Sequence, residues 1–343
     1  MKIGLLTSGG DCPGLNAVIR AITRKADIYN FETIGIKNGW KGLFDESFIQ
    51  LNLSSVAGII NRGGTILGTS RFNPFTEKNG KETLLHKISR ENFDAIISIG
   101  GEGSMHIAQQ AVESGINVIG IPKTIDNDIY GTDYSFGFDT AVQIATEAID
   151  RLHTTAESHH RIMLLEVMGR HAGWIALYSG IAGGADVVII PEKKIKIDDV
   201  CDVLKSRYTR GKLFSIIVVA EGAQFLEEEM NKVSENKKLD EFGRVRLGGI
   251  SRYLAEEIEK RTEFETRTTI LGYVQRGGVP SAFDRVLGTR LGVYAVDMVK
   301  EKKFGRMCAI QGNVITDITI KKSISKLKTV DLEIYKVAQV FFK

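Results

Sequence analysis

The sequence predicts an α/β fold built from two Rossmann-like domains with parallel sheets, and two observations support this prediction. Short apolar segments rich in Ile, Val and Leu recur along the chain, and each ends in a glycine-rich or polar turn. Several of these turns lead into segments whose apolar residues have helical spacing. Strands that are apolar throughout and alternate with helices are typical of parallel sheets covered on both faces. Ligands of such sheets bind beyond the carboxyl ends of the strands, so we expect polar residues there to line a crevice.

The predicted strands are residues 2–7, 94–99, 117–121, 161–167, 214–220 and 269–274. One helix is expected from Leu15, and another after residue 100, with Ser104 as its cap. Residues 138–152 carry a long apolar stripe, which predicts a helix that crosses from the first domain to the second. The charge-dense residues 225–246 are expected to form a solvated helical insertion.

Composition favours a globular enzyme-sized protein over other classes. The chain has 343 residues, of which 43% are hydrophobic and 25% charged, which suits two domains of average size. A formal net charge of +3 predicts neither a nucleic-acid nor a membrane partner. The widely separated Cys12, Cys201 and Cys308 make no disulfide framework or metal spacing. Without a signal peptide or an apolar run long enough to span a bilayer, we expect a cytoplasmic protein.

Two glycine-rich turns follow predicted strands. In T-S-G-G-D-C-P-G-L-N (7–16), glycines allow backbone N–H groups to approach a phosphate at a helix N-terminus. G-G-E-G-S (100–104) repeats the pattern with Glu102, which suits a metal ion or a metal-bound water. The alternatives are tight turns that need glycine and an exposed acid. Two such turns together favour phosphate binding.

The segment T-I-D-N-D (124–128) is the strongest chemical signal. One of its carboxylates is suited to accept a proton from an attacking hydroxyl, and the other to hold Mg²⁺. Residues two apart in an extended stretch share a face, so Asp126 and Asp128 are expected to serve one site. The alternatives are an Asx-type turn, and a solvated side chain for Lys123.

Five arginines lie near strand ends or glycine turns and are candidates for bidentate phosphate binding: Arg71, Arg161, Arg170, Arg267 and Arg276. For any one of them alone, a surface ion pair is the simpler interpretation. Glu221, at a strand end, is suited to accept hydrogen bonds from sugar hydroxyls, with a helix N-terminal acid as the alternative. His159 and His160 lack metal-ligand spacing and are interpreted as structural.

Taken together, these motifs resemble those of ATP-dependent 6-phosphofructokinases of the bacterial type. The resemblance covers nearly the whole chain and also includes N-R-G-G-T-I-L-G-T-S-R-F, E-V-M-G-R-H-A-G and E-T-R-T-T-I-L-G-Y-V-Q-R-G-G. It implies a glycolytic transferase that moves the γ-phosphoryl group of Mg·ATP to the 1-hydroxyl of fructose 6-phosphate. The products are fructose 1,6-bisphosphate and ADP. It also implies an active site in the cleft between the two domains.

The resemblance implies a role for each matching residue. Asp126 is the expected base, aided by Gly10, Thr124 and Arg170, while Glu102 and Asp128 hold Mg²⁺. The expected ATP side consists of Gly10, Arg71, Phe72, Gly101, Glu102, Gly103 and Ser104. The expected sugar-phosphate side consists of Thr124, Ile125, Asp126, Arg161, Met168, Gly169, Arg170, Glu221, Arg267, Tyr273 and Arg276. Arg161 and Arg267 are expected to serve a neighbouring subunit, which implies a homotetramer, or a dimer with the same interface.

The same resemblance implies domain boundaries. Residues 1–137 plus about 275–325 would bind ATP and Mg²⁺, and residues 138–274 plus about 326–343 would bind the sugar phosphate.

Three departures from the family pattern bear on donor and acceptor. Glu102 replaces the common aspartate, and Tyr273 replaces the usual histidine. Lys123 is typical of pyrophosphate-using relatives, whereas Gly103 is the residue of ATP users. Because a carboxylate at position 103 would repel a nucleotide phosphate, we predict ATP as donor. Pyrophosphate as donor, or a related acceptor such as sedoheptulose 7-phosphate, is the alternative.

The family's effector pocket is partly altered. Arg20, Arg24, Asp186, Arg210 and Lys212 match it, but Leu53, Gly58 and His153 depart from it. We therefore expect weak or absent control by ADP and phosphoenolpyruvate.

Other function classes fit less well. Diacylglycerol or NAD kinases share a G-G-D-G-like loop but lack T-I-D-N-D and Q-R-G-G. A dinucleotide oxidoreductase would need G-x-G-x-x-G at the first helix. A non-catalytic regulatory subunit would be expected to have lost Glu102, Asp126 or Asp128, all of which are present.

Overall fold

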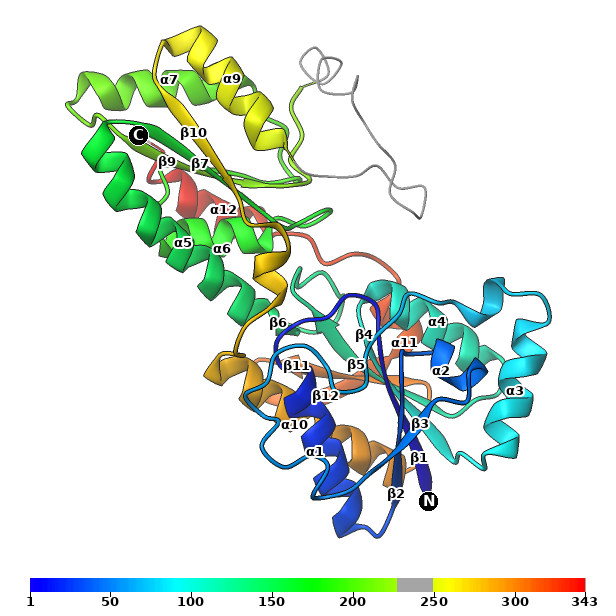
Figure 1. Ribbon diagram of the computed structural model, residues 1–343. Helices are drawn as coiled ribbons and strands as arrows, with labels where there is room; N and C mark the ends of the chain where they lie inside the picture. Colours follow the sequence, from blue (N-terminus) through cyan, green and yellow to red (C-terminus); the bar gives the residue numbers. More distant parts are fainter. Residues whose placement is uncertain (227–248, 343) are drawn as a thin grey trace. The chain divides into compact units, whose positions relative to one another are not determined.

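The computed structural model describes residues 1–226 and 249–342, which divide into two compact units (Figure 1). Unit 1 comprises Met1–Thr140 and Arg276–Lys328, and unit 2 comprises Ala141–Gln275 and Thr329–Lys343. Of the expected charged insertion, residues 227–246 lie outside the described residues. Its first residue, Phe225, is fully buried in the core of unit 2, so the expectation of a solvated segment is wrong there.

Unit 1 is built on a mixed sheet whose central strands are parallel. The strands are β1 (Lys2–Ser8), β2 (Glu32–Ile36), β3 (Phe48–Leu51), β4 (Ala95–Gly100), β5 (Val118–Thr124), β6 (Phe136–Gly137), β11 (Arg306–Gln311) and β12 (Val314–Thr319). Their order is β12-β11-β5-β4-β1-β2-β3, with β6 paired to the end of β5. Only the edge strands β3 and β12 run antiparallel to their neighbours. The sequence reasoning predicted β1, β4 and β5 but missed the outer strands.

Helices cover both faces of this sheet (Figure 1). They are α1 (Leu15–Ile28), α2 (Lys41–Phe44), α3 (Gly80–Arg90), α4 (Glu102–Glu113), α10 (Ala282–Lys300) and α11 (Ile320–Ser323), with a short 3₁₀ helix at Pro74–Thr76. α1 packs on α10, and α4 packs on α11. α1 and α10 approach closely because Gly288 of α10 has no side chain: a Cβ there would lie 2.9 Å from Val18 Cγ2 of α1. The helix predicted from Leu15 is confirmed.

Unit 2 contains a fully parallel four-stranded sheet in the order β10-β7-β9-β8. The strands are β7 (Ile162–Val167), β8 (Val187–Ile189), β9 (Ser215–Ala220) and β10 (Thr266–Ile270). The helices are α5 (Phe138–His159), α6 (Trp174–Ala182), α7 (Ile197–Thr209), α9 (Ile250–Thr262) and α12 (Leu332–Gln339). α7 and α9 pack together, and α6 packs on α12, β8 and β9 (Figure 1). The predicted long helix is confirmed as α5, which contains the boundary between the units.

One strand prediction is wrong in its bounds. The expected strand 269–274 is instead the end of β10 at Ile270, followed by a 3₁₀ helix at Gly272–Arg276. Gly272 has a φ of 48°, a conformation that ends an extended strand and that glycine adopts without strain. The segment I-L-G-Y-V therefore contains a turn, although its apolar composition suggested a continuous strand.

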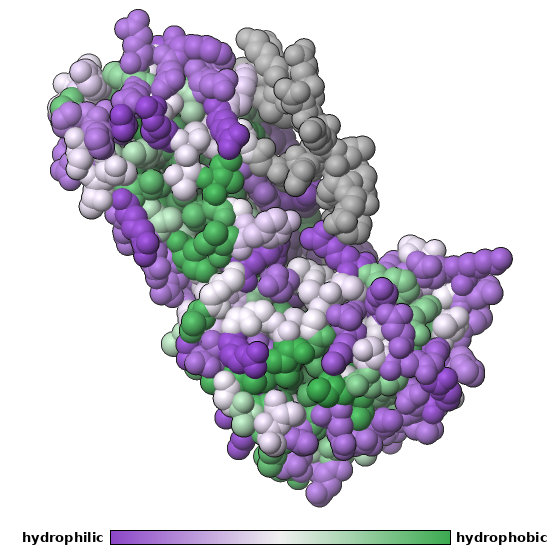
Figure 2. All heavy atoms as spheres, in the orientation of Figure 1, coloured by the Kyte–Doolittle hydropathy of each residue, from purple (hydrophilic) through white to green (hydrophobic). Residues whose placement is uncertain are grey.

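Apolar and hydrophilic side chains are mixed on the face shown in Figure 2. In unit 1, three exposed apolar side chains lie at the start of α10: Val279, Phe283 and Val286, with exposed fractions of 62%, 41% and 59%. The Phe283 ring contacts that of Tyr134 at a centroid distance of 5.4 Å. Among the described residues, no helix is both long and apolar enough to cross a membrane.

Glu166 is a buried carboxylate that caps a helix in unit 2. Its side chain is 1% exposed and accepts hydrogen bonds from the Gly249 and Ser251 backbone N–H groups and the Ser251 hydroxyl, at 2.7–3.1 Å. These donors lie at the N-terminus of α9, where the helix dipole also favours a negative charge. Glu166 therefore fastens α9 to β7.

We predict that Glu166→Ala lowers the free energy of unfolding by about 3 kcal/mol, because it leaves buried N–H groups without an acceptor. Urea unfolding followed by circular dichroism measures this change. Glu256→Ala, an exposed position on the same helix, is the control and should change stability by less than about 0.5 kcal/mol. Equal unfolding midpoints for both variants would contradict the capping role.

Candidate active site

Three polar turns of unit 1 lie side by side at one edge of the sheet. They follow β1, β4 and β5, which are neighbours in the order β5-β4-β1 and run parallel. The turns approach closely: a Cβ on Gly9 would lie 3.2 Å from the Ser104 hydroxyl oxygen, and one on Gly101 would lie 3.3 Å from the Lys123 carbonyl oxygen. The turns predicted separately from sequence thus form one cluster.

The turn after β1 is held from both sides. The Gly9 N–H donates to the Ser70 carbonyl at 2.9 Å, and the Thr69 hydroxyl donates to the Gly9 carbonyl at 2.6 Å. The Arg276 guanidinium donates to the Asp11 carbonyl at 3.3 Å. A Cβ on Gly10 would lie 2.8 Å from Arg276 Nη1, so a side chain here would displace the guanidinium from its present position. Arg276, predicted for the sugar side, belongs to unit 1 beside Gly10.

Lys123 supports the same turn from beneath. Its side chain is 3% exposed and its ammonium donates to the Gly10 carbonyl. Burial, and the nearby Arg276 charge, lower the pKa of Lys123, while Asp11 and Asp126 act in the opposite direction. The alternative of a solvated lysine is therefore wrong.

The turn after β4 begins α4 earlier than predicted. The helix starts at Glu102 with Gly101 as N-cap, so the expectation that Ser104 caps it is wrong. Ser104 is instead buried in the first turn of α4, where a Cβ added to Gly100 would lie 2.2 Å from the Cβ of Ser104. This close contact requires glycine at position 100.

Glu102 lies in the first turn of α4 and is partly exposed. Its Oε1 is 2.7 Å from His106 Nε2, one helical turn further on. Next to it, a Cβ added to Gly103 would meet no heavy atom within 4 Å among the described residues. Position 103 therefore borders open space.

The segment after β5 places Asp126 and Asp128 together by a different route from the one predicted. Asn127 between them has a φ of 51°, so the segment is not extended, and the argument from strand alternation is wrong. The Asp126 N–H donates to the Thr124 hydroxyl at 3.0 Å, and Asn127 Oδ1 accepts from the Ser135 N–H at 3.1 Å. The side chain of Ile125 is fully buried, so only its backbone is available to a substrate.

The surroundings of Asp128 disfavour the ionised form of its carboxyl group. Burial, and next the charge of Asp126, raise the pKa of Asp128 to about 7, with a smaller contribution from Glu102. A hydrogen bond with the Thr124 hydroxyl acts in the opposite direction. Within residues 1–226 and 249–342, Asp128 Oδ1 is buried without a hydrogen-bond partner. Such a group is suited to a cation.

The two remaining donor-side residues differ in burial. Arg71 is exposed. Phe72 is partly buried against the core, and its ring meets that of Phe44 edge-on at 5.0 Å. Phe72 thus also has a packing role.

In unit 2, the acceptor-side candidates lie at the carboxyl ends of β7 and β9. Gly169, with a φ of 140°, follows Met168, and its carbonyl accepts from the Gly222 N–H at 3.0 Å. A Cβ on Gly222 would lie 2.0 Å from the Arg170 carbonyl oxygen, so the turns that carry Arg170 and Glu221 touch. Met168, Gly169, Arg170 and Glu221 therefore belong to one cluster.

Arg161 and Arg267 lie away from that cluster. Both pair with Glu265, and they stand at or near the amino ends of β7 and β10. β7 has six residues, so it separates Arg161 from Met168 by roughly 20 Å. Within one chain, the structure does not bring these arginines to Met168. Tyr273 is strongly exposed after β10.

Three residues near these clusters were missed from sequence. His106 pairs with Glu102, and Gln275 is fully buried with its Oε1 accepting from the Met168 N–H at 3.3 Å. Lys328, 195 residues from Asp133 in sequence, donates to the carbonyls around the β5 loop. Burial lowers the pKa of Lys328 to about 8, with Asp133 and Asp128 acting in the opposite direction. Only Gln275 stood inside a quoted motif.

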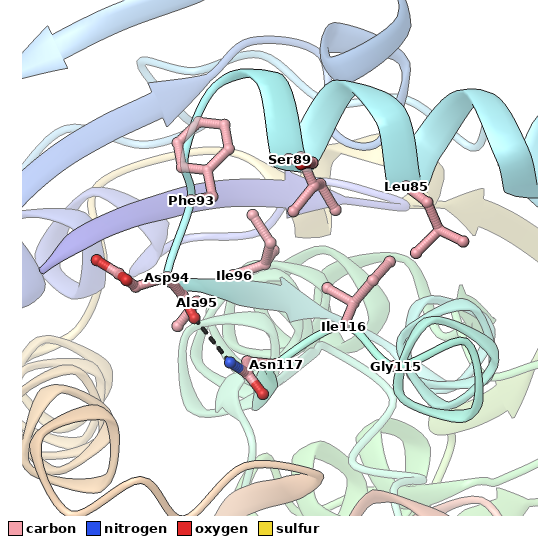
Figure 3. A pocket seen from close by; sticks show the side chains of 10 residues that line it. Leu85, Ser89, Phe93, Asp94, Ala95, Ile96, Gly115, Ile116 and Asn117 are labelled. Carbon is pink, nitrogen blue, oxygen red and sulfur yellow. Dashed lines mark hydrogen bonds between the residues drawn. The ribbon is translucent and has the colours of Figure 1, made fainter.

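Two cavities lie elsewhere. One of about 200 Å³ lies by α3 and the amino ends of β4 and β5, and both apolar and polar residues line it, including Leu85, Ile96 and Asn117 (Figure 3). The other, of about 190 Å³ in unit 2, includes Asp186 and Arg207. The Asp186 carboxylate is engaged by Arg207 at 2.7 Å and by the Ile216 N–H at 2.9 Å. Burial raises the pKa of Asp186.

A family model described as Phosphofructokinase matches residues 2–299. The chain belongs to the phosphofructokinase family. It is an enzyme of the phosphotransferase class, and its α/β sheets confirm the predicted fold class.

Relatives of the family differ in the donor that their names give. The chain is 51% identical to a pyrophosphate–fructose 6-phosphate 1-phosphotransferase of Streptomyces coelicolor, over 100% of both chains. It is 49% identical to an ATP-dependent 6-phosphofructokinase 3 of the same organism, over 96% of both. A phosphofructokinase structure from Saccharomyces cerevisiae has a TM-score of 0.80 at 29% identity. That match covers 99% of this chain but 46% of the yeast chain, so this chain spans under half of the yeast protein's length.

The acidic cluster of Glu102, Asp126 and Asp128 fits Mg²⁺ when a phosphate supplies further ligands. Among the described residues, no three acidic, histidine or cysteine side chains converge as a preformed metal cage. Mg²⁺ in phosphoryl-transfer sites is held by one or two carboxylates, several waters and the substrate phosphates. The unpartnered Asp128 Oδ1, with Glu102 close enough to influence its pKa, satisfies this requirement.

We predict that divalent-cation binding weakens as the pH falls below 7. Asp128 has a raised pKa in the folded protein, so it keeps its proton up to about pH 7, and the cation must displace that proton. Electron paramagnetic resonance of Mn²⁺ should show the dissociation constant rising about fivefold from pH 7 to pH 6, because Asp128 is already half protonated at pH 7. Asp128→Asn should bind more weakly with little pH dependence. A pH-independent constant in the parent protein would contradict the assignment.

Proposed function

We propose that the protein transfers the γ-phosphoryl group of Mg·ATP to the 1-hydroxyl of fructose 6-phosphate. The observation that carries this proposal is the pair Asp126 and Asp128, set beside two glycine turns at the carboxyl ends of three adjacent strands. In phosphoryl transfer the protein mainly positions groups and stabilises charge. A carboxylate pair next to two glycine turns and an arginine, Arg276, supplies these functions.

Asp126 acts as the base that accepts the hydroxyl proton. Thr124 orders this segment, because its hydroxyl accepts from the Asp126 N–H and also hydrogen-bonds with Asp128. The Gly10 backbone and Arg170 stabilise the moving phosphoryl group. Bound Mg²⁺ would screen the phosphate charges, and Glu102 and Asp128 are the residues that would hold it.

ATP is the proposed donor because of position 103. The open space beside Gly103 leaves room for a nucleotide next to the first turn of α4. Gly101 and Ser104 belong to the same turn, Phe72 packs against the core that includes residues of α4, and Arg71 precedes Phe72 in sequence. An aspartate there would project a negative charge into that space and repel phosphate. Gly103 therefore supports ATP.

Pyrophosphate is the second candidate, and two observations favour it. Lys123 is typical of pyrophosphate users, and several relatives carry that donor in their names. However, the Lys123 ammonium donates to the Gly10 carbonyl and is buried, which accounts for a lysine here as a support for the turn. Lys123 alone does not require pyrophosphate.

The residues proposed to bind the acceptor are those that the family resemblance implies: Thr124, Ile125, Met168, Gly169, Arg170, Glu221, Tyr273 and Arg276. Sedoheptulose 7-phosphate, a ketose phosphate one carbon longer that also carries a 1-hydroxyl, is the alternative acceptor.

Arg161 and Arg267 are proposed to clamp the 6-phosphate bound by a neighbouring subunit. Their distance from Met168 within one chain supports this role, because it places them away from the other residues proposed to bind the acceptor. The exposed Val279, Phe283 and Val286 supply apolar surface for such an assembly. We propose a homotetramer, or a dimer with the same interface, acting in the cytoplasm as a glycolytic enzyme.

The test is a matrix of the purified protein with Mg²⁺, both donors and several sugar phosphates. We predict that kcat/KM with ATP and fructose 6-phosphate exceeds that with pyrophosphate by at least about a hundredfold, a difference of about 3 kcal/mol. Coupled assays of fructose 1,6-bisphosphate formation measure it. Turnover with pyrophosphate alone would refute the ATP assignment, and no turnover of any sugar phosphate would refute the function.

Substitution at position 103 provides matched variants for this assay. Gly103→Asp should abolish most ATP-dependent activity, whereas Gly103→Ser, which adds bulk without charge, should lose less. Both should fold, because a Cβ added at position 103 meets no heavy atom within 4 Å among the described residues.

A further inference from the structure

The last residues of unit 1 lie across the loop that carries Asp126 and Asp128. Leu327 forms an antiparallel bridge with Ile129, and the Lys328 N–H donates to the Asp128 carbonyl at 2.8 Å. Just before them, the Lys326 ammonium lies over the Tyr130 ring, 4.5 Å from its centroid. We call residues 326–328 the strap.

The side chain of Lys328 reaches further along the same loop. Its ammonium donates to the Thr132 carbonyl at 3.0 Å and to the Asp133 carbonyl at 2.5 Å. The backbone and side chain of one residue therefore join position 128 to positions 132 and 133. An ammonium has three N–H donors and no acceptor, so it is suited to gather carbonyl groups in this way.

The far side of the loop is fixed independently of the strap. The Ile310 N–H donates to the Thr132 hydroxyl at 3.0 Å, and the Asp133 N–H donates to the Ile310 carbonyl at 2.8 Å. These contacts anchor positions 132 and 133 to β11. Lys328 thus ties Asp128 to an anchored part of the sheet.

Asp128 needs such a fastening because its Oδ1 is buried with no hydrogen-bond partner among the described residues to hold the side chain in place. Asn127, in a left-handed conformation, gives the backbone between the two aspartates a hinge-like geometry that contacts must hold.

We infer that Lys328 is a positioning residue that holds the Asp126–Asp128 loop in its reactive geometry. The inference rests on the proposed function, in which Asp126 is the base. Lys328 acts through the loop and touches no reacting atom. Misplacing a reacting group by about 1 Å is enough to cost roughly a hundredfold in rate.

The test compares Lys328→Met with the parent enzyme under saturating substrates. Methionine keeps an unbranched apolar side chain but loses the ammonium and its hydrogen bonds. We predict that kcat falls by about tenfold to a hundredfold, while KM for donor and sugar phosphate changes by less than about twofold. Lys322→Met, an exposed lysine of α11, removes the same charge and should match the parent. If Lys328→Met does not fold, Lys328→Gln replaces it in the same measurements.

A double-mutant cycle with Asp126→Asn separates positioning from general destabilisation. If Lys328 acts through Asp126, its loss should lower kcat by less than about twofold when Asp126 is already replaced. An equal fold-loss in both backgrounds, or an unchanged kcat in Lys328→Met, would overturn the inference. Asp126→Asn with parental activity would instead refute the proposed function, whatever Lys328 does.

Discussion

The site depends on the electrostatic repulsion among acidic side chains gathered at the end of β5. Burial and the charge of Asp126 together raise the pKa of Asp128 to about 7, so the metal-free protein keeps a proton where a cation would otherwise sit. Such a group contributes to stability at low pH, and that contribution is lost as the pH rises towards 7. A bound cation removes this cost and also supplies the charge that phosphoryl transfer requires. The close approach of these carboxyl groups therefore destabilises the metal-free protein but creates a binding site for the cation that the reaction needs.

Neutral backbone groups and cations hold this arrangement in place. Gly9 and Gly101 let the three turns approach closely, because an added Cβ would lie 3.2 Å from Ser104 Oγ and 3.3 Å from the Lys123 carbonyl oxygen, respectively. Gly10 and Gly100 leave room for the Arg276 guanidinium and the Ser104 side chain. Two cations then bind carbonyls of the turn after β1: Lys123 donates to the Gly10 carbonyl, and Arg276 donates to the Asp11 carbonyl. Lys328 does the same for the loop after β5. Lysines that are bound to carbonyls keep positive charge near the site without neutralising the acids that react.

The sequence predicted the part of the site that is local along the chain. G-G-E-G-S and T-I-D-N-D follow apolar strands, so their placement at strand ends could be inferred from pattern alone. It failed where the decisive contact is remote or conformational: Lys328 lies 200 residues beyond Asp128, and the left-handed Asn127 replaces the expected extended backbone. It also misplaced the start of α4, since a buried serine and a capping serine look alike in sequence. Outer strands such as β2 and β11 were missed because only the central strands were followed by recognisable turns.

The most direct test of the account is the single-turnover rate of Asp126→Asn with Mg·ATP and fructose 6-phosphate. An asparagine keeps the shape of the loop but cannot accept the hydroxyl proton. The account predicts a rate reduced by about a hundredfold to ten thousandfold, with substrate binding and the unfolding midpoint close to those of the parent. A rate equal to that of the parent would contradict the claim that this carboxylate performs proton transfer.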